Sequence, residues 1–192
     1  SLLEYYRVGG WLPNGPPGVE YCDIMGAQHE IPLMVSAYQK GIRNYDVDKA
    51  YEAVKKTLTT QGTALSSGGI VGNRHLDVYL KYGFVPYGEK SHHNVFGTTY
   101  EGPTSNTLEY AFDDWNAAQF AKALGYEEDY DYFTRRAYNY KNVFDSETKY
   151  VRPKYSDGTW MPDFEPINKD EHSTSWSWLG SGFVEGNSWQ YT

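Results

Sequence analysis

The apolar positions of this sequence repeat mainly every three or four residues, which is the spacing of amphipathic helices. In the first half of the chain the spacing predicts helices over residues 31–42, 46–58 and 74–81. Pro32 is tolerated because it falls in a first turn, and Asp46 is suited to cap the start of its helix. The opening residues, SLLEYYRVGGW, read as the last turns of a further helix.

The clearest helical pattern covers residues 107–124, TLEYAFDDWNAAQFAKAL. Asn106 and Glu109 are expected to form a capping pair at its start, and Gly125 is expected to end it. A last helix is predicted over residues 128–143. The apolar face of the 107–124 helix is expected to carry Leu108, Phe112, Trp115, Ala118 and Leu124.

Long connections rich in glycine, proline and aromatic residues separate these helices. The chain has no alternating strand pattern and no exact internal repeat. We therefore predict an all-α fold in which helical hairpins are arranged around an axis, with their loops gathered at one end. A TPR-like solenoid is the alternative, and the unequal helix spacing argues against it.

Aromatic residues make up 17% of the chain, with 19 Tyr and 6 Trp. A tyrosine hydroxyl needs a hydrogen-bond partner, so tyrosine is a poor choice for a dry core. The surplus favours a wet groove in which rings stack on sugars. An aromatic-rich core is the alternative.

The net charge of -8 argues against a nucleic-acid partner, because the chain offers no basic stripe for phosphates. A single cysteine, Cys22, excludes an internal disulfide and a cysteine-based zinc site. No apolar run approaches the roughly 18 residues needed to span a bilayer, so we expect no membrane span.

Two carboxylates, Glu109 and Asp113, stand four residues apart on the 107–124 helix and so share one face. That face either points to solvent or lines a polar cavity where carboxylates bind sugar hydroxyls. Asp114 is one step round the helix, and we expect it to be structural. His29, in MGAQHEIP, is either satisfied by nearby backbone or forms a hydrogen-bonding wall of a pocket.

Trp11, in GGWLP, is either a stacking platform for a sugar or a loop aromatic anchored in the core. His92 and His93 are adjacent without a spaced third ligand, which makes a weak metal signal. We interpret them as loop residues.

The stretch GFVEGNSWQYT concentrates hydrogen-bonding and aromatic groups around Glu185. Asn187 is suited to cap a helix that starts at the next residue. Neighbouring aromatic rings would raise the pKa of Glu185, as a general acid requires, whereas a helix dipole would lower it. The alternative is a surface carboxylate in a glycine turn.

Several motifs occur together in one order: GGWLP, a His before an apolar helix that ends YQKGIRNYD, TLEYAFDDWNAAQFAKALG, RRAYNYKNVFDSET, DGTWMPDFEP and VEGNSWQYT. This order resembles glycoside hydrolase family 92, the calcium-dependent exo-acting α-mannosidases. TLEYAFDDW and EGNSWQYT are the most specific parts of the match, which covers nearly the whole chain.

The resemblance implies an (α/α)6-barrel catalytic domain, of which residues 1–192 would be a part. The family's N-terminal β-sandwich domain and the C-terminal part of the barrel would lie outside this chain. We expect such a slice to expose apolar helix faces and to need the remainder of the same enzyme.

The resemblance further implies removal of terminal α-linked mannose, of α-1,2 type, from mannose-containing glycans with inversion, by a periplasmic or secreted bacterial enzyme. It places the catalytic acid on Glu185. The general base and the calcium ligands would lie in later motifs. The candidate substrate-binding residues are Trp11, His29, Glu109, Asp113, Asn187, Trp189 and Gln190.

Two departures from the family pattern bear on the substrate pocket. NGPPG stands where many members carry a second Trp after GGWLP, and GAQHE replaces the commoner short Gly-x-His form. Linkage preference is therefore open. The rival hypothesis is a non-catalytic helical carbohydrate-binding or scaffold module in which Glu185 only accepts a hydrogen bond.

Overall fold

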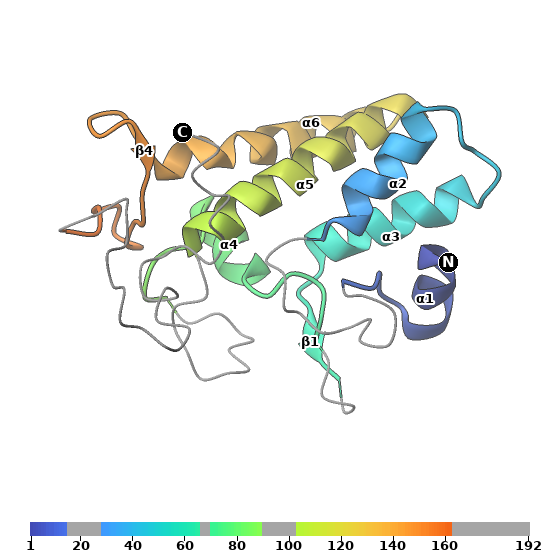
Figure 1. Cartoon of the computed structure of the whole chain (residues 1–192), viewed down its shortest axis with the longest axis horizontal. Helices are drawn as coiled ribbons and strands as arrows, with labels where there is room; N and C mark the ends of the chain where they lie inside the picture. The colour runs from blue at the N-terminus through green and yellow to red at the C-terminus, as the bar shows by residue number, and fades with distance from the viewer. Residues whose placement is uncertain (15–27, 66–69, 90–102, 163–192) are drawn as a thin grey trace, which may run out of the picture.

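The computed structural model describes residues 1–14, 28–65, 70–89 and 103–162 (Figure 1). Several residues singled out from the sequence lie outside these ranges: Cys22, His92, His93, Glu185, Asn187, Trp189 and Gln190.

The described chain is mostly helical, which confirms the predicted all-α class (Figure 1). The helices are α1 (Leu2–Gly9), α2 (Glu30–Gln39), α3 (Val47–Thr59), α4 (Leu76–Tyr82), α5 (Pro103–Leu124), α6 (Glu127–Ala137) and the 3₁₀ helix η1 (Tyr138–Val143). Two antiparallel hairpins accompany them, formed by β1 (Thr63–Ala64) with β2 (Ile70–Val71) and by β3 (Phe144–Asp145) with β4 (Tyr150–Val151). Strands of two residues are too short to produce an alternating pattern in the sequence. None of the described helices is long and apolar enough to cross a membrane.

Most predicted helix ends are close to the observed ones. The Asp46 side chain accepts a hydrogen bond from the Lys49 backbone N–H at 3.0 Å and caps α3, as predicted. Gly125 follows α5 with φ of 81°, in the left-handed region where glycine is favoured, which confirms it as the stop signal.

Two predictions about the helices of the second half are wrong. α5 begins at Pro103, so Asn106 lies inside the helix and is not its N-cap, as the expected capping pair with Glu109 requires. Proline supplies a start signal here because its fixed φ suits a first turn. The single helix predicted over residues 128–143 is instead α6 followed by η1, because the last residues tighten into a 3₁₀ helix.

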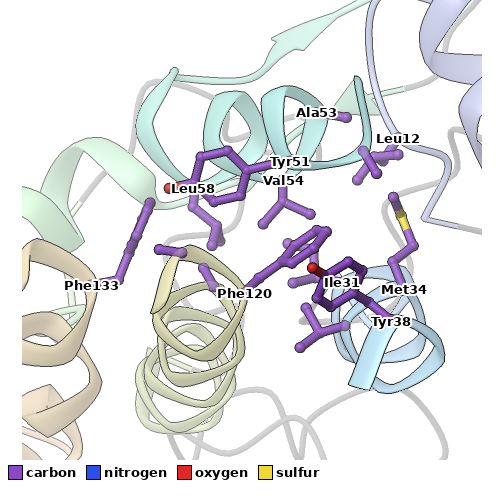
Figure 2. Close-up of a cluster of buried hydrophobic side chains, with 14 of the residues drawn as sticks. Leu12, Ile31, Met34, Tyr38, Tyr51, Ala53, Val54, Leu58, Phe120 and Phe133 are labelled. Carbon is purple, nitrogen blue, oxygen red and sulfur yellow. The ribbon is translucent and has the colours of Figure 1, made fainter. Parts of the chain in front are cut away.

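The core forms where α2 and α3 meet α5 and α6 (Figure 2). Phe120 of α5 is at its centre, with its ring centroid 5.2 Å from that of Tyr38 and 5.6 Å from that of Tyr51. α5 and α6 lie side by side as an antiparallel helical hairpin (Figure 1). The buried residues labelled in Figure 2 are Leu12, Ile31, Met34, Tyr38, Tyr51, Ala53, Val54, Leu58, Phe120 and Phe133.

The burial of α5 does not follow the polarity of its two faces. Phe112 and Trp115, on the predicted apolar face, are 41% and 52% exposed. Glu109 and Asp113, for which a solvated face was one alternative, are 5% and 0% exposed. That alternative is therefore wrong. The physical reason is that α5 has neighbours on several sides, so burial follows those neighbours and not the polarity of one face.

The exposed aromatic residues of α5 line a groove of about 670 Å³. Its walls come from α5, the end of α6, η1 and the β3–β4 hairpin. The lining is almost wholly apolar, with one lysine: Leu108, Ala111, Phe112, Trp115, Ala137, Tyr140, Lys141, Phe144 and Val151.

Three tyrosine hydroxyls donate hydrogen bonds to carboxylates. Tyr6 donates to Glu52 at 2.9 Å, Tyr51 to Asp129 at 2.6 Å and Tyr79 to Asp114 at 2.8 Å. These pairs join helices far apart in the sequence, and they show that part of the tyrosine surplus serves the packing of the helices.

Candidate functional site

The two carboxylates predicted to share a face of α5 lie against the start of α2. The Asp113 Oδ2 atom accepts a hydrogen bond from the Gln28 backbone N–H at 3.0 Å. One turn earlier, Glu109 Oε2 is 3.7 Å from His29 Nε2. The structure therefore brings together three of the residues that the sequence singled out.

These three side chains differ sharply in their access to solvent. The side chain of His29 is 53% exposed, whereas that of Glu109 is 6% exposed. Asp113 has no exposed surface in the described structure. An incoming ligand would meet the His29 imidazole first, with the Glu109 carboxylate behind it. Asp113 acts on this surface only through its neighbours.

Glu30 is a third buried carboxyl group next to this cluster, in the first turn of α2. Burial raises its pKa to about 8. Burial also raises the pKa of Asp113 well above its usual range, and the nearby Glu30 and Glu109 add to the effect. Among the described residues, Glu30 Oε1 and Asp113 Oδ1 have no hydrogen-bond partner. Burial therefore disfavours the charged form of both carboxyl groups.

Trp11 is buried, and both a cation and a glycine lie against its ring. The Lys56 ammonium is 4.5 Å from the ring centre and donates to the Gly10 carbonyl at 2.6 Å. A Cβ placed on Gly72 would be 2.8 Å from Trp11 Cζ3, so this close approach requires glycine. Of the two interpretations of Trp11, the described contacts favour a loop aromatic anchored in the core.

Gln28 connects Trp11 with the carboxylates. Its side-chain Nε2 donates to the Gly72 carbonyl at 3.4 Å, and its backbone N–H is held by Asp113. Gln28, Glu30 and Gly72 were not predicted from the sequence as parts of this site. For the first two the available signal was their position in GAQHE, on either side of His29. For Gly72 the sequence carries no signal of a long-range contact.

The described residues do not form a metal centre. Within residues 1–14, 28–65, 70–89 and 103–162, no group of three His, Cys, Asp or Glu side chains is placed to hold an ion. The apolar groove lies elsewhere on α5 and contains no carboxylate, so we assign the candidate site to the start of α2 and not to that groove. Glu185, Asn187, Trp189 and Gln190 lie outside the described residues.

Comparison with known proteins decides the family. The glycosyl hydrolase family 92 catalytic domain matches the chain over residues 1–192. The chain belongs to this family. The helical fold agrees, because the chain superposes on family 92 structures. An inverting mannosidase of this family from Bacteroides thetaiotaomicron is 30% identical, with a TM-score of 0.73 over 86% of this chain.

A second family 92 protein of that organism, an α-mannosidase solved in complex with mannoimidazole, is 32% identical, with a TM-score of 0.71 over 87% of this chain. A curated fungal relative from Arthroderma benhamiae, named an uncharacterized secreted glycosidase, is 28% identical over 83% of this chain. The chain spans about a fifth of the length of these relatives: 21% of the first structure, 20% of the second and 21% of the fungal protein.

Proposed function

We propose that the full-length protein is a glycosidase that removes terminal α-linked mannose, of α-1,2 type, from mannose-containing glycans with inversion at the anomeric carbon. The family match over the whole chain carries this proposal. The names of the structural relatives, an inverting mannosidase and an α-mannosidase bound to mannoimidazole, support the sugar and the stereochemistry.

In the proposed reaction, Glu185 is the general acid. Its carboxyl group gives a proton to the departing glycosidic oxygen, and the bond from that oxygen to the anomeric carbon breaks. A base elsewhere in the full-length protein takes a proton from the water that attacks the opposite face of the sugar. Inverting enzymes hold such a pair about 6.5–9.5 Å apart to leave room for the water.

The described residues would supply part of the sugar-binding wall. The exposed His29 imidazole and the carboxylate of Glu109 behind it can both hydrogen-bond sugar hydroxyls. Asn187, Trp189 and Gln190 are proposed to contact the sugar near Glu185. We propose that Trp11 and Asp113 contribute to the same wall from buried positions.

We also propose that the full-length protein requires calcium. Among the described residues, no group of three His, Cys, Asp or Glu side chains is placed to hold it. A bound calcium ion would act as a Lewis acid and orient sugar oxygens. Chelation with EDTA should abolish hydrolysis of α-mannosides, and calcium should restore it. Full activity in EDTA would contradict the requirement.

A periplasmic or secreted location is part of the same proposal. It is supported by the name of the fungal relative, a secreted glycosidase. Cell fractionation with an antibody to the full-length protein tests it, and recovery in the cytosol alone would contradict it.

The acid role of Glu185 predicts a difference between substrates. In the full-length protein, Glu185→Gln should lower kcat by about 10²–10⁴-fold on unactivated mannosides, whose leaving group needs the proton. Mannosides with a good leaving group, such as 2,4-dinitrophenyl mannoside, should lose much less. Steady-state kinetics on both substrates measures the two losses.

Glu128→Gln, at an exposed position in the first turn of α6, is the matched control and should leave both substrates unaffected. Equal losses on both substrates in Glu185→Gln would count against the acid role. If the wild-type protein binds mannose-containing glycans but hydrolyses none, the non-catalytic carbohydrate-binding module becomes the better account.

A further inference from the structure

Three consecutive residues at the start of α2 face the carboxyl groups of the candidate site. The Gln28 backbone N–H donates to Asp113, the His29 imidazole faces Glu109, and Glu30 is buried close to Asp113. Of the three, His29 alone offers a largely exposed side chain. The position of His29 therefore depends on how its neighbours are fixed.

Gln28 is fixed at two points that belong to different parts of the fold. Its backbone is held by α5 through Asp113, 85 residues away in the sequence. Its side chain reaches the Gly72 carbonyl, 44 residues away, at the end of the β1–β2 hairpin. Gly72 in turn lies directly against the ring of Trp11.

We propose that Gln28 is a positioning residue for the sugar-binding wall, acting with Asp113 to hold the His29–Glu109 pair at a set place relative to Trp11. Gln28 does not contact the sugar, because it is 2% exposed. The inference rests on the proposed function of the site, and it assigns to Asp113 an indirect role in place of direct sugar contact.

The chemical nature of the Gln28 side chain supports a positioning role for this residue over a role in packing alone. A leucine would fill the same volume without a polar atom, whereas Gln28 Oε1 is buried and has no hydrogen-bond partner among the described residues. Such an atom weakens the fold, and its presence indicates a gain from the bond that Nε2 makes to Gly72.

The test uses the full-length protein with Gln28→Leu, which removes the bond to Gly72 but keeps the backbone bond to Asp113. Gln28→Asn keeps the amide group, but its side chain is one methylene too short to reach the Gly72 carbonyl. This variant replaces Gln28→Leu in the test if the leucine variant does not fold. Gln39→Leu, at the exposed other end of α2, is the matched control. The measurements are KM and kcat on an α-mannoside, Kd for mannoimidazole, and the melting temperature.

A misplaced wall weakens binding of substrate and transition state alike, which raises KM and leaves kcat nearly unchanged. We expect Gln28→Leu and Gln28→Asn to raise KM and Kd by roughly 5–50-fold, with kcat within about twofold of wild type. Gln39→Leu should change neither. A lower melting temperature with KM and Kd equal to those of the control would overturn the inference.

Failure of the proposed function gives a different result. A wild-type protein that neither hydrolyses an α-mannoside nor binds mannoimidazole would remove the proposed function, and this inference with it. A wild-type protein that does both, with Gln28 variants identical to Gln39→Leu, would remove the inference alone.

Discussion

Two buried carboxyl groups, Glu30 and Asp113, lie where α5 packs against the start of α2. Glu30 and Asp113 have little or no access to water, and burial raises the pKa of both. Carboxyl groups in this state are costly to the fold, and groups with strongly shifted pKa values gather at functional sites. Glu30 and Asp113 therefore support the assignment of the site to the start of α2, where it packs against α5.

The raised pKa of Glu30 predicts a pH-dependent cost. Below pH 4.5, its ordinary pKa, the group is protonated in both folded and unfolded protein, so its ionisation does not change stability there. Between pH 4.5 and about 8 the unfolded form ionises while the folded form stays protonated, so stability falls as the pH rises. Glu30→Gln removes this loss. The variant should gain stability over wild type between pH 5 and 8, by an amount on the order of several kcal/mol.

Chemical denaturation of both proteins at a series of pH values measures this difference. Glu128→Gln, which changes an exposed carboxylate, should follow the wild-type profile. Parallel profiles for wild type and Glu30→Gln would show that Glu30 titrates normally in the folded protein.

Residue-scale prediction from the sequence succeeded where a rule of spacing applied. Glu109 and Asp113 share a face because a helix brings positions four apart together, and the structure confirms this. Their burial was not predictable in the same way, because it depends on α2 lying against that face. The link from Gln28 to Gly72 and Asp113 joins positions far apart in the chain, for which one sequence holds no signal.

At the scale of elements, α5 contacts α2, α3, α6 and η1 and carries polar groups on its buried sides. Asp114 meets Arg136 of α6, with Oδ1 2.7 Å from Nη2 and Oδ2 3.0 Å from Nε. Tyr79 of α4 donates to the same carboxylate. This cluster joins three helices, and it gives Asp114 the structural role that the sequence predicted. Helical periodicity predicted α5 itself but not the exposure of Phe112 and Trp115. α5 packs against neighbours on several sides, and these neighbours bury its polar residues.

The buried pair predicts a large stability loss on truncation. Asp114→Ala leaves Arg136 buried without its partner and should lower the free energy of unfolding by about 3–5 kcal/mol. Lys55→Ala removes a more exposed pair with Asp129 and should cost at most about 1 kcal/mol. Denaturant titration compares the two variants. Equal losses would mean that the Asp114–Arg136 pair contributes no more than a surface contact.

At the scale of the whole molecule, motif order predicted more than any single pattern did. The family followed from six motifs in sequence and the all-α class from helical periodicity, and both are confirmed by the family match and by the superposed structures. Helix periodicity alone left a solenoid open. The groove around Phe112 and Trp115 places apolar side chains at the surface of the described chain.

The anomeric form of the sugar that is released first shows whether the full-length protein cleaves α-mannosides with inversion. Proton NMR can follow the anomeric signals during hydrolysis of an α-mannoside, before the released sugar equilibrates in water. The account predicts β-mannose as the first product, with α-mannose appearing later by mutarotation. Release of α-mannose first, or no release of mannose, would contradict it.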